Sequence, residues 1–514
     1  MSFYDFYGSK KTKTNNNLKR SFVTFMVKKI NTMWLKNILL YILLLSAIVA
    51  DAQPPTKFYC TYGGNGYDVG YDVKQTLDGG YIITGSTSSY GMGNTDMYLL
   101  KLDSMGQKVF QNTFGGVSNE IGKSVVQLAD SSYVMVGYTS SSGVGGYDVF
   151  LVKADKAGNL MWQKTIGGAD WDFANSLQAT LDGGFIIAGT TYSYGHGNAD
   201  GYIIKTDAMG DTTWTKTYGG LKDDEFKSVI QTADGNYALV GYTKSYNDSL
   251  GDVWAIKLDI NGDTLWQKFY GGIKKDFGNQ IIEHPNGDFF IAGGTESFGV
   301  GKMDGYALKL DNIGNQFLQQ EHGYSGNDEE FTSIIFSKRN LNVIGFMEKE
   351  FFNGFNLQFK LFEWTTNLGY INGTDYGSID NDETFKIIAT KDKGYASVGY
   401  TKGYGAINSD VYFLKSDSNL VGSTSIVSIN EFNIDENIFR KFPNPTSNEI
   451  NFITNTNIQK AIIKLYDILG NEISLKENLN FISNKHFILN TEHLVSGIYF
   501  VSISNKIEKI LVVH

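Results

Sequence analysis

"DGGYIITGSTSSYG", from Asp78 to Gly91, returns 104 residues later as "DGGFIIAGTTYSYG", from Asp182 to Gly195. The same period runs through much of the chain. Glycine pairs start at positions 63, 115, 167, 219 and 271, each 52 residues after the last, and the series continues to Gly323 and Gly377. Because many separate positions share one period, we expect a chain built from repeated structural units.

Two further residue types keep this period. A second glycine occurs at Gly85, Gly137, Gly189, Gly241, Gly293, Gly345 and Gly399. An aspartate occurs at Asp96, Asp148, Asp200, Asp252, Asp304 and Asp410, with Asn356 in its place in the sixth unit. The repeat therefore comprises seven units.

Each unit contains four strand-like runs. In the first unit these are "VGYDVKQT", "YIITGSTS", "DMYLLKLD" and "KVFQNTF", separated by the turn-forming stretches "LDGG", "YGMGNT" and "SMGQ". A repeat of about 50 residues with four antiparallel strands is typical of a β-propeller blade. One blade cannot bury both of its faces, so blades in a ring must cover one another.

The two ends of the repeat predict how the ring closes. "KFYCTYGG", from Lys57 to Gly64, matches the fourth run of later units, such as "MWQKTIGG" from Met161 to Gly168. The seventh unit stops after its third run, "DVYFLKSD", from Asp410 to Asp417. We therefore predict an all-β fold, a seven-bladed propeller of four-stranded blades within residues 53–417, whose last blade is closed by the N-terminal strand.

Residues 1–52 have a different composition, with 8 Lys/Arg and 2 acidic residues. They end in "MWLKNILLYILLLSAIVADAQ", from Met33 to Gln53, which has the basic start, short apolar middle and small residues of a secretory signal peptide. We expect cleavage between Ala52 and Gln53. The alternative is a membrane anchor, but the 13-residue apolar run Ile38–Ala50 is shorter than the roughly 20 residues that span a bilayer.

Without residues 1–52 the chain has 36 basic residues (44 − 8) and 52 acidic residues (54 − 2), a net charge of −16. Such an anionic protein is not expected to bind nucleic acid through its phosphates. Cys60 is the only cysteine, so no internal disulfide can form. We expect a monomer.

The last part of the chain has another pattern. A polar linker over residues 418–438 precedes residues 439–514, where short alternating strands such as "IIKLYDILGNEI" and "SGIYFVSIS" are separated by Asn/Gly turns. This pattern predicts a small Ig-like β-sandwich.

Both parts resemble known families. The blade motifs "W-x-K-T-x-G-G", "D-G-G-[FY]-I-I-x-G-T" and "D-x-[YF]-[LI]-x-K-x-D-x-x-G" resemble the bacterial β-propeller repeat abbreviated SBBP, which implies an extracellular protein and no particular activity.

The tail is similar to the type A C-terminal sorting domain of the type IX secretion system of Bacteroidetes. The residues that carry this resemblance are Pro443, Asn444, Pro445, Gly470, Gly497 and Tyr499. The resemblance implies recognition by the type IX secretion machinery, and then secretion or attachment to the outer cell surface. The alternative is a generic adhesion module.

Acidic residues recur five positions after the first glycine of each unit, at Asp68, Glu120, Asp172, Asp224, Asp276, Asp328 and Asp382. With the aspartate series, thirteen carboxylates are expected near one face of the ring. A residue needed in every blade is expected to serve the blade itself by accepting hydrogen bonds from loop N–H groups. We expect no cofactor; the alternative is that the acidic clusters around Asp224, Asp328 and Asp382 bind Ca²⁺ or contact a glycan.

A ligand site should lie where the repeat breaks, because recognition needs one site rather than seven equal ones. On the predicted loop face, this criterion selects Tyr194, His196, Tyr246, Phe351 and Phe352 as candidate ligand-binding residues. Their aromatic rings could stack on sugars, and the alternative is packing against neighbouring blades.

No catalytic signature is present in the sequence: it contains no Gly-x-Ser-x-Gly, no phosphate-binding loop and no His-Glu-x-x-His motif. We therefore expect a secreted binding or scaffold propeller that recognises a glycan or a protein. The alternative is an extracellular carbohydrate-active enzyme with its site at the central opening, since such enzymes need only two carboxylates.

Overall fold

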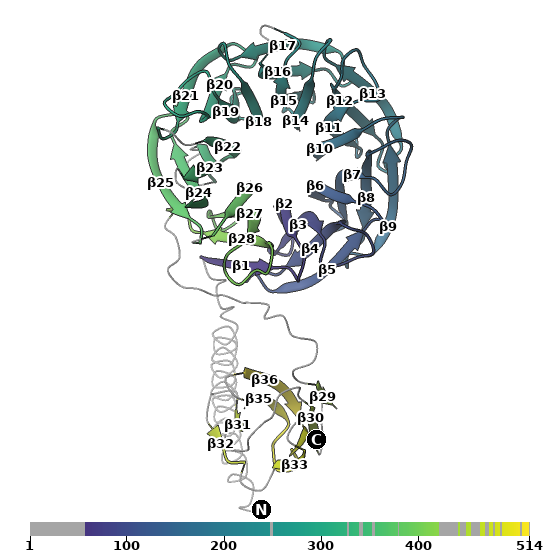
Figure 1. Cartoon of the computed structure of the whole chain (residues 1–514), viewed down its shortest axis with the longest axis vertical. Coiled ribbons are helices and arrows are strands. Elements are labelled where there is room, and N and C mark those ends of the chain that lie inside the picture. Colours follow the sequence, from purple (N-terminus) through teal and green to yellow (C-terminus); the bar gives the residue numbers. More distant parts are fainter. Residues whose placement is uncertain are drawn as a thin grey trace, which may run out of the picture. The chain divides into compact units, whose positions relative to one another are not determined.

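The computed structural model describes residues 57–246, 250–325, 328–338, 343–351, 355–378, 380–420, 440–442, 449–453, 463–467, 472–475, 479–483, 486–503 and 506–512. These residues form nine four-stranded antiparallel sheets. Seven of the sheets follow the repeat and stand in a ring (Figure 1). We call them blades one to seven. Within the described part of the chain, no helix is long and apolar enough to cross a membrane.

Within each blade, the first strand lies nearest the centre of the ring and the fourth strand lies at the outer edge (Figure 1). The first strands are β2 (Asp68–Gln75), β6 (Glu120–Gln127), β10 (Asp172–Ala179), β14 (Asp224–Gln231), β18 (Asp276–Glu283), β22 (Glu329–Phe336) and β26 (Asp382–Ala389). The second strands are β3 (Tyr81–Thr87), β7 (Tyr133–Thr139), β11 (Phe185–Thr191), β15 (Tyr237–Thr243), β19 (Phe289–Thr295), β23 (Val343–Phe351) and β27 (Tyr395–Thr401).

The outer half of each blade follows the same order. The third strands are β4 (Asp96–Leu102), β8 (Asp148–Ala154), β12 (Asp200–Thr206), β16 (Asp252–Leu258), β20 (Asp304–Leu310), β24 (Phe355–Trp364) and β28 (Asp410–Ser416). The fourth strands are β5 (Lys108–Phe114), β9 (Leu160–Ile166), β13 (Thr212–Tyr218), β17 (Thr264–Tyr270), β21 (Gln316–His322), β25 (Tyr370–Tyr376) and β1 (Phe58–Tyr62).

The N-terminal strand completes the last blade, as predicted. β1 pairs antiparallel with β28 from Phe58↔Lys415 to Tyr62↔Val411. Lys57 also forms a 2.9 Å ion pair with Asp417. On the inner side, the Lys391 N–H of blade seven donates to Gln75 Oε1 of blade one at 2.7 Å. The ring is therefore closed both at its outer edge and near its centre.

Apolar cores lie between neighbouring blades. The core shared by blades two and three combines Val136 and Leu151 with Phe185 and Tyr202. Since each second and third strand has a neighbour on both faces, β3 and β4 are buried along their whole length. Each buried aliphatic or aromatic side chain contributes about 1.5–3 kcal/mol to folding, so the ring gains stability at every junction.

The repeated glycine of the second strand is explained by a close backbone contact. A Cβ atom at Gly85 would lie 1.8 Å from the Val69 carbonyl oxygen of the first strand. The register of these two strands shifts immediately after the pair Gly70↔Gly85, which marks a β-bulge at Tyr71. The same bulge and close contact occur at Gly137, Gly189, Gly241, Gly293 and Gly399.

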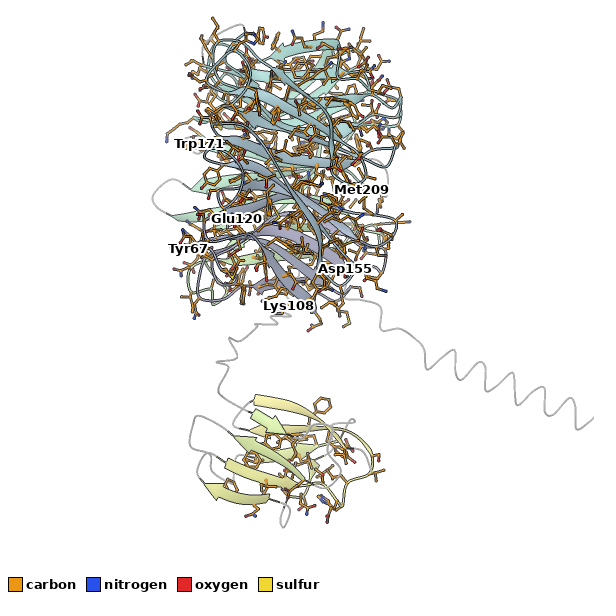
Figure 2. All side chains as sticks on the ribbon, turned by 90° about the vertical axis from the view of Figure 1, so that its right-hand side faces the viewer. Tyr67, Lys108, Glu120, Asp155, Trp171 and Met209 are labelled. Carbon is orange, nitrogen blue, oxygen red and sulfur yellow. The ribbon has the colours of Figure 1, made fainter. Side chains whose placement is uncertain are left out.

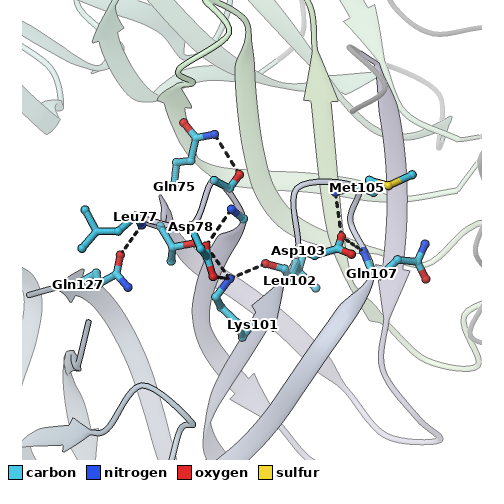
Figure 3. A network of polar contacts seen from close by, with 12 residues as sticks. Gln75, Leu77, Asp78, Lys101, Leu102, Asp103, Met105, Gln107 and Gln127 are labelled. Carbon is cyan, nitrogen blue, oxygen red and sulfur yellow. Dashed lines mark hydrogen bonds and ion pairs between the residues drawn. The ribbon is translucent and has the colours of Figure 1, made fainter. Parts of the chain in front are cut away.

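A buried lysine holds the turn between the first two strands (Figure 3). Lys101 Nζ forms a 3.0 Å ion pair with Asp78 and donates to the Leu102 carbonyl oxygen at 2.8 Å. Equivalent ion pairs join Lys205 to Asp182, Lys257 to Asp234 and Lys415 to Asp392. These pairs explain why the aspartate of this turn and the lysine of the third strand recur together.

The C-terminal part forms a separate β-sandwich. One sheet has the order β29 (Arg440–Phe442), β30 (Glu449–Ile453), β34 (His486–Asn490) and β33 (Leu479–Ser483). The other has the order β32 (Glu472–Ile473), β31 (Ile463–Tyr466), β35 (Gly497–Ile503) and β36 (Lys506–Val512). Both sheets contribute to one core, which includes Phe452, Phe487, Leu465 and Val501.

Two of the predicted sorting residues are described here. Gly497 begins β35, and Tyr499 is buried with its hydroxyl donating to the Val495 carbonyl oxygen at 2.8 Å. Pro443, Asn444, Pro445 and Gly470 lie outside the described residues, as do the signal peptide and the cleavage site at Ala52 and Gln53.

Prediction of ring closure: removing the side chain of Phe58 should destabilise the propeller, because this ring is fully buried against Phe413 and Tyr81. We expect Phe58→Ala to lower the free energy of unfolding by about 3–5 kcal/mol, and deletion of residues 58–61 to lower the melting temperature further. Val109→Ala, on the exposed side of the outer strand β5, is the matched control. A melting temperature unchanged by the deletion would contradict closure by β1.

Candidate functional site

The ring has two unlike faces. The loops before the first strands and the loops between second and third strands lie on one face, which we call the loop face. Tyr67, Glu120 and Trp171 lie on this face and Asp155 and Met209, in tight turns, lie on the other (Figure 2). Among the described residues, the two kinds of loop meet at six blade junctions; between blades one and two, the Asn94 N–H donates to the Ser118 carbonyl oxygen at 2.9 Å.

The acidic residues that begin the first strands organise these loops. Asp68 accepts the Gly64 N–H at 2.9 Å and the Ser89 hydroxyl at 2.5 Å. Glycine N–H groups are bound in the same way by Glu120, Asp172, Asp224 and Asp276, at 2.7–2.8 Å. The predicted role of this acid within the blade is therefore confirmed.

In blade six the structure corrects the sequence alignment. β22 begins at Glu329, which is 2% exposed, and its carboxylate accepts the Tyr324 N–H at 3.2 Å. Asp328, which the period selected, is instead partly exposed and lies 3.8 Å from Lys302. The loop before β22 is one residue longer than the equivalent loop of the other blades. Counting five residues from the first glycine therefore selects Asp328 instead of Glu329.

The aspartates that begin the third strands bind the other loop. Asp96 accepts the Gly93 N–H at 2.9 Å, and Asp200 accepts the N–H groups of His196 and Gly197 at 2.8 and 3.1 Å. Carboxylates from adjacent blades then meet at one glycine: a Cβ atom at Gly115 would lie 2.0 Å from Glu120 and 2.8 Å from Asp96. Burial, together with the nearby Glu120 carboxylate, raises the pKa of Asp96.

These carboxylates are consequently part of the scaffold. The seven first-strand acids are at most 2% exposed, as are Asp96, Asp148, Asp200, Asp252 and Asp304. Among the residues that the structure describes, no group of three or more His, Cys, Asp or Glu side chains is placed to hold a metal ion.

Tyr194 and Tyr246, two of the predicted ligand residues, hold their own loops. The Tyr194 hydroxyl donates to the Gly167 carbonyl oxygen at 2.9 Å, and that of Tyr246 donates to Gly219 at 3.1 Å. Tyr246 also stacks on Phe269, with 4.8 Å between ring centroids. Tyr90 makes the same hydrogen bond to Gly63 in blade one, so the contact belongs to the repeat.

Of the other three predicted residues, His196 shares the loop of Tyr194. His196 is exposed at the tip of its loop. Phe351 ends β23 in blade six, where only its backbone is described, and Phe352 lies outside the described residues. Whether any of the five residues contacts a ligand stays a prediction.

A cluster of five aromatic rings lies on the loop face between blades two and three. Trp171 contacts Tyr147, Phe173 and Tyr192, with centroid distances of 6.1–6.2 Å. Tyr138 joins the cluster 4.9 Å from Phe173 and 5.4 Å from Tyr147. Trp171 is 49% exposed and Tyr192 is 42% exposed. We call these five residues the aromatic cluster.

Sequence reasoning missed this cluster although a signal existed. The candidates selected from the sequence include aromatic residues that follow the second strands, such as Tyr194 and Tyr246. These residues recur from unit to unit because they hold loops. Trp171 precedes the acid of the first strand, and tryptophan occupies that position in one unit alone. The rule that function lies where the repeat breaks would have selected it.

The inner edge of the ring also breaks the repeat. Every first strand has its bulge at the fourth residue, and the bulged residues are Tyr71, Lys123, Asn175, Lys227, Asn279, Thr332 and Phe385. Each of these side chains contacts a neighbouring blade: Tyr71 lies 4.9 Å from Phe385, and Lys227 Nζ donates to Asn279 Oδ1 at 3.0 Å. One conserved backbone feature thus presents five different side-chain types at the inner edge.

A cavity of about 400 Å³ opens beside these bulges at blades four to six. Its walls contain three lysines, two glutamates and three apolar or aromatic residues. They are Glu225, Lys227, Tyr242, Lys244, Lys275, Phe277, Met303 and Glu330. Unlike the aromatic cluster, the cavity is rich in charge.

The cavity and the aromatic cluster lie on adjoining blades, three and four, which the Asn175 amide joins by donating to Glu225 Oε1 of the cavity wall at 3.1 Å. Burial and the nearby carboxylates of Asp223 and Glu225 raise the pKa of Tyr192, and the Lys244 ammonium group opposes this effect. Lys244 and Glu225 line the cavity, whereas Tyr192 belongs to the cluster. Together the two features form one asymmetric surface over blades two to six, which we take as the candidate site.

Prediction for Lys123: stability should depend on its titration. Burial, with the Lys227 cation nearby, lowers the pKa of Lys123 to about 8 from the usual 10.5. Between these pH values the unfolded chain binds the proton more tightly, so the contribution of Lys123 to stability rises with pH. We expect the free energy of unfolding of the native chain, relative to Lys123→Met, to increase from pH 8 to pH 10, measured by urea unfolding. A difference independent of pH would contradict this.

Comparison with known proteins identifies the tail. Residues 440–513 match the family described as "Secretion system C-terminal sorting domain". A segment of 229 residues is 29% identical to the "Regulatory protein FlaEY" of Caulobacter vibrioides, covering 37% of this chain and 24% of that protein. The chain thus spans about a quarter of the length of this curated relative.

Two solved structures of low identity are also similar. The Pan2 WD40 domain of Neurospora crassa is 10% identical with a TM-score of 0.42, covering 68% of this chain and 89% of that one. Sqt1 of Chaetomium thermophilum is 12% identical with a TM-score of 0.40, covering 70% and 90%. Its own sheets and its matched tail show that this chain is a β-propeller repeat protein that carries a secretion system C-terminal sorting domain.

Proposed function

We propose that this protein is exported by the type IX secretion system and binds a glycan with the loop face of its propeller, at the aromatic cluster and the adjoining cavity. The observation that carries the proposal is the exposure of Trp171 and Tyr192 within a five-ring cluster on the loop face, where Trp171 occupies a position that holds tryptophan in one unit alone. An aromatic residue that served only the fold would be expected in every blade.

Aromatic rings of this kind suit sugars. The C–H faces of a sugar ring stack on the flat surface of Trp or Tyr, and this contact keeps the sugar hydroxyls in water. The cluster is held rigid, because Phe173 lies on β10 and Tyr138 on β7, both anchored in the blades. Little side-chain freedom is then lost on binding.

Location supports the same function. The C-terminal sorting domain indicates a protein that is secreted or attached to the cell surface and that interacts with the secretion machinery. Outside the cell, polysaccharides are abundant ligands. In this proposal, Pro443, Asn444, Pro445, Gly470, Gly497 and Tyr499 serve export, and the propeller alone serves recognition.

A second candidate function is glycan cleavage. Glu225, Glu330 and Glu383 each follow the buried acid of their first strand, and Glu225 and Glu330 line the cavity. Glu225 Oε1 accepts the Asn175 amide at 3.1 Å, and Glu330 Oε2 accepts the Asn279 amide at 3.3 Å. Two such carboxylates are what a glycoside hydrolase needs. Release of reducing sugar from a bound glycan, abolished in Glu225→Gln, would favour this alternative.

Prediction of glycan binding: in a glycan array followed by calorimetry, the chain should bind at least one glycan. Trp171→Ala and Tyr192→Ala should each weaken binding about fivefold, the loss of roughly 1 kcal/mol of stacking. Tyr67→Ala is the matched control, since Tyr67 also precedes a first-strand acid and is 59% exposed, but lies in blade one. Ala substitutions at Tyr194, His196, Tyr246, Phe351 and Phe352 extend the test. Unchanged affinity in both cluster variants would refute this site.

Prediction of export: a chain that ends near residue 421 should fold but remain inside the outer membrane. The reason is that it keeps all seven blades and loses the sorting domain, which has a core of its own. Cell fractionation with protease accessibility would measure this. Normal surface display of the truncated chain would contradict the role given to residues 440–513.

A further inference from the structure

Lysine is distributed unevenly over the loop face. The loops of blades one to three, at residues 63–67, 88–95, 115–119, 140–147, 167–171 and 192–199, contain no Lys or Arg. The corresponding loops of blades four and five contain Lys222, Lys244, Lys274, Lys275 and Lys302. The same loops contain three acidic residues, Asp223, Asp248 and Glu296, so their net charge is +2 (5 − 3), and an anionic protein carries a basic arc on one side of one face.

The lysines of this arc and of the adjoining inner edge are only partly neutralised. Lys244 forms a 2.9 Å ion pair with Asp223. The ammonium group of Lys227 donates to the neutral Asn279 amide oxygen at 3.0 Å. Lys275 is exposed, and within the described part of the chain the contact recorded for its ammonium group is the Phe277 ring, 5.1 Å away.

Two of these cations lie against one ring. Lys227 Nζ is 4.6 Å from the centroid of Phe277, and Lys275 Nζ is 5.1 Å from it. The ring supports both ammonium groups without neutralising either, because a cation–π contact leaves the net charge unchanged. An anionic group that enters the cavity would meet two positive charges already held in place.

We propose that the glycan recognised here is an acidic polysaccharide, whose sugar rings stack on Trp171 and Tyr192 and whose carboxylate or sulfate groups bind Lys227 and Lys275 in the cavity. This inference rests on the proposed function and adds the chemical class of the ligand. The aromatic cluster and the cavity lie on adjoining blades of the ring, so one chain of sugars can reach both.

The balance of charge in the cavity favours a polysaccharide over a nucleic acid. Glu225 and Glu330 line the same walls as the lysines. A nucleic acid presents one phosphate per nucleotide, so its neighbouring charges would face these glutamates. A polysaccharide with one acidic group per sugar, and neutral hydroxyls between them, can place single charges at the lysines and hydroxyls at the glutamates.

The test compares two probes with the same backbone. The full chain is titrated by calorimetry with polygalacturonate and with its fully methyl-esterified form, in which the carboxylates are neutralised, at low and high salt. We expect polygalacturonate to bind more tightly, with affinity that falls as salt rises. Lys275→Gln and Lys227→Gln should each weaken it by up to about fivefold and reduce the salt dependence, whereas Lys164→Gln, an equal charge change on the outer strand β9, should have no effect.

Each other outcome overturns the inference. If the esterified form binds equally well and Lys275→Gln changes nothing while Trp171→Ala weakens binding, the ligand is a neutral glycan and the proposed function stands. If a single-stranded oligonucleotide binds and polygalacturonate does not, the arc is a nucleic-acid site. If no glycan binds to a chain with a normal melting temperature, both the inference and the proposed function fail.

Discussion

The propeller is stable only when both faces of each blade are covered by neighbouring blades. β3 and β4 are buried along their whole length, which is stable only while a neighbouring sheet lies on each side. An open row of blades would expose two such faces, and the packing of blade seven, completed by β1, on blade one covers both. A short N-terminal strand therefore contributes to the junction that closes the ring.

This constraint separates the scaffold from the site. The positions that recur in every blade, such as the glycine at Gly85 and the acid at Asp68, are accounted for by a close backbone contact and by loop N–H groups. A residue that makes these contacts within its own blade is not free to bind a ligand. Recognition is left to positions where the backbone recurs but the side chain does not, which are the bulged residues and the loop residue before each first-strand acid.

The ring could be predicted from the sequence because the repeat period is visible in the residues alone, without any knowledge of their contacts. Blade number, the closing strand and the role of the acids all follow from spacing and turn chemistry. In blade six the period predicts Asp328 rather than Glu329, because one inserted residue shifts the spacing. The aromatic cluster could not be read in this way, since exposure of Trp171 and its contact with Tyr147 of the preceding blade depend on how two sheets meet.

The position of the aromatic cluster follows from the contacts at the inner edge. Polar or aromatic contacts of the bulged residues join blades three to four, four to five, five to six, seven to one, and one to two. Among the described contacts, none of this kind joins Lys123 to Asn175 between blades two and three. Tyr138 and Tyr147 instead meet Phe173 and Trp171 across that junction. The cluster thus cross-links the blades through the half-buried rings of Tyr138, Tyr147 and Phe173, and this leaves the exposed faces of Trp171 and Tyr192 available to a ligand.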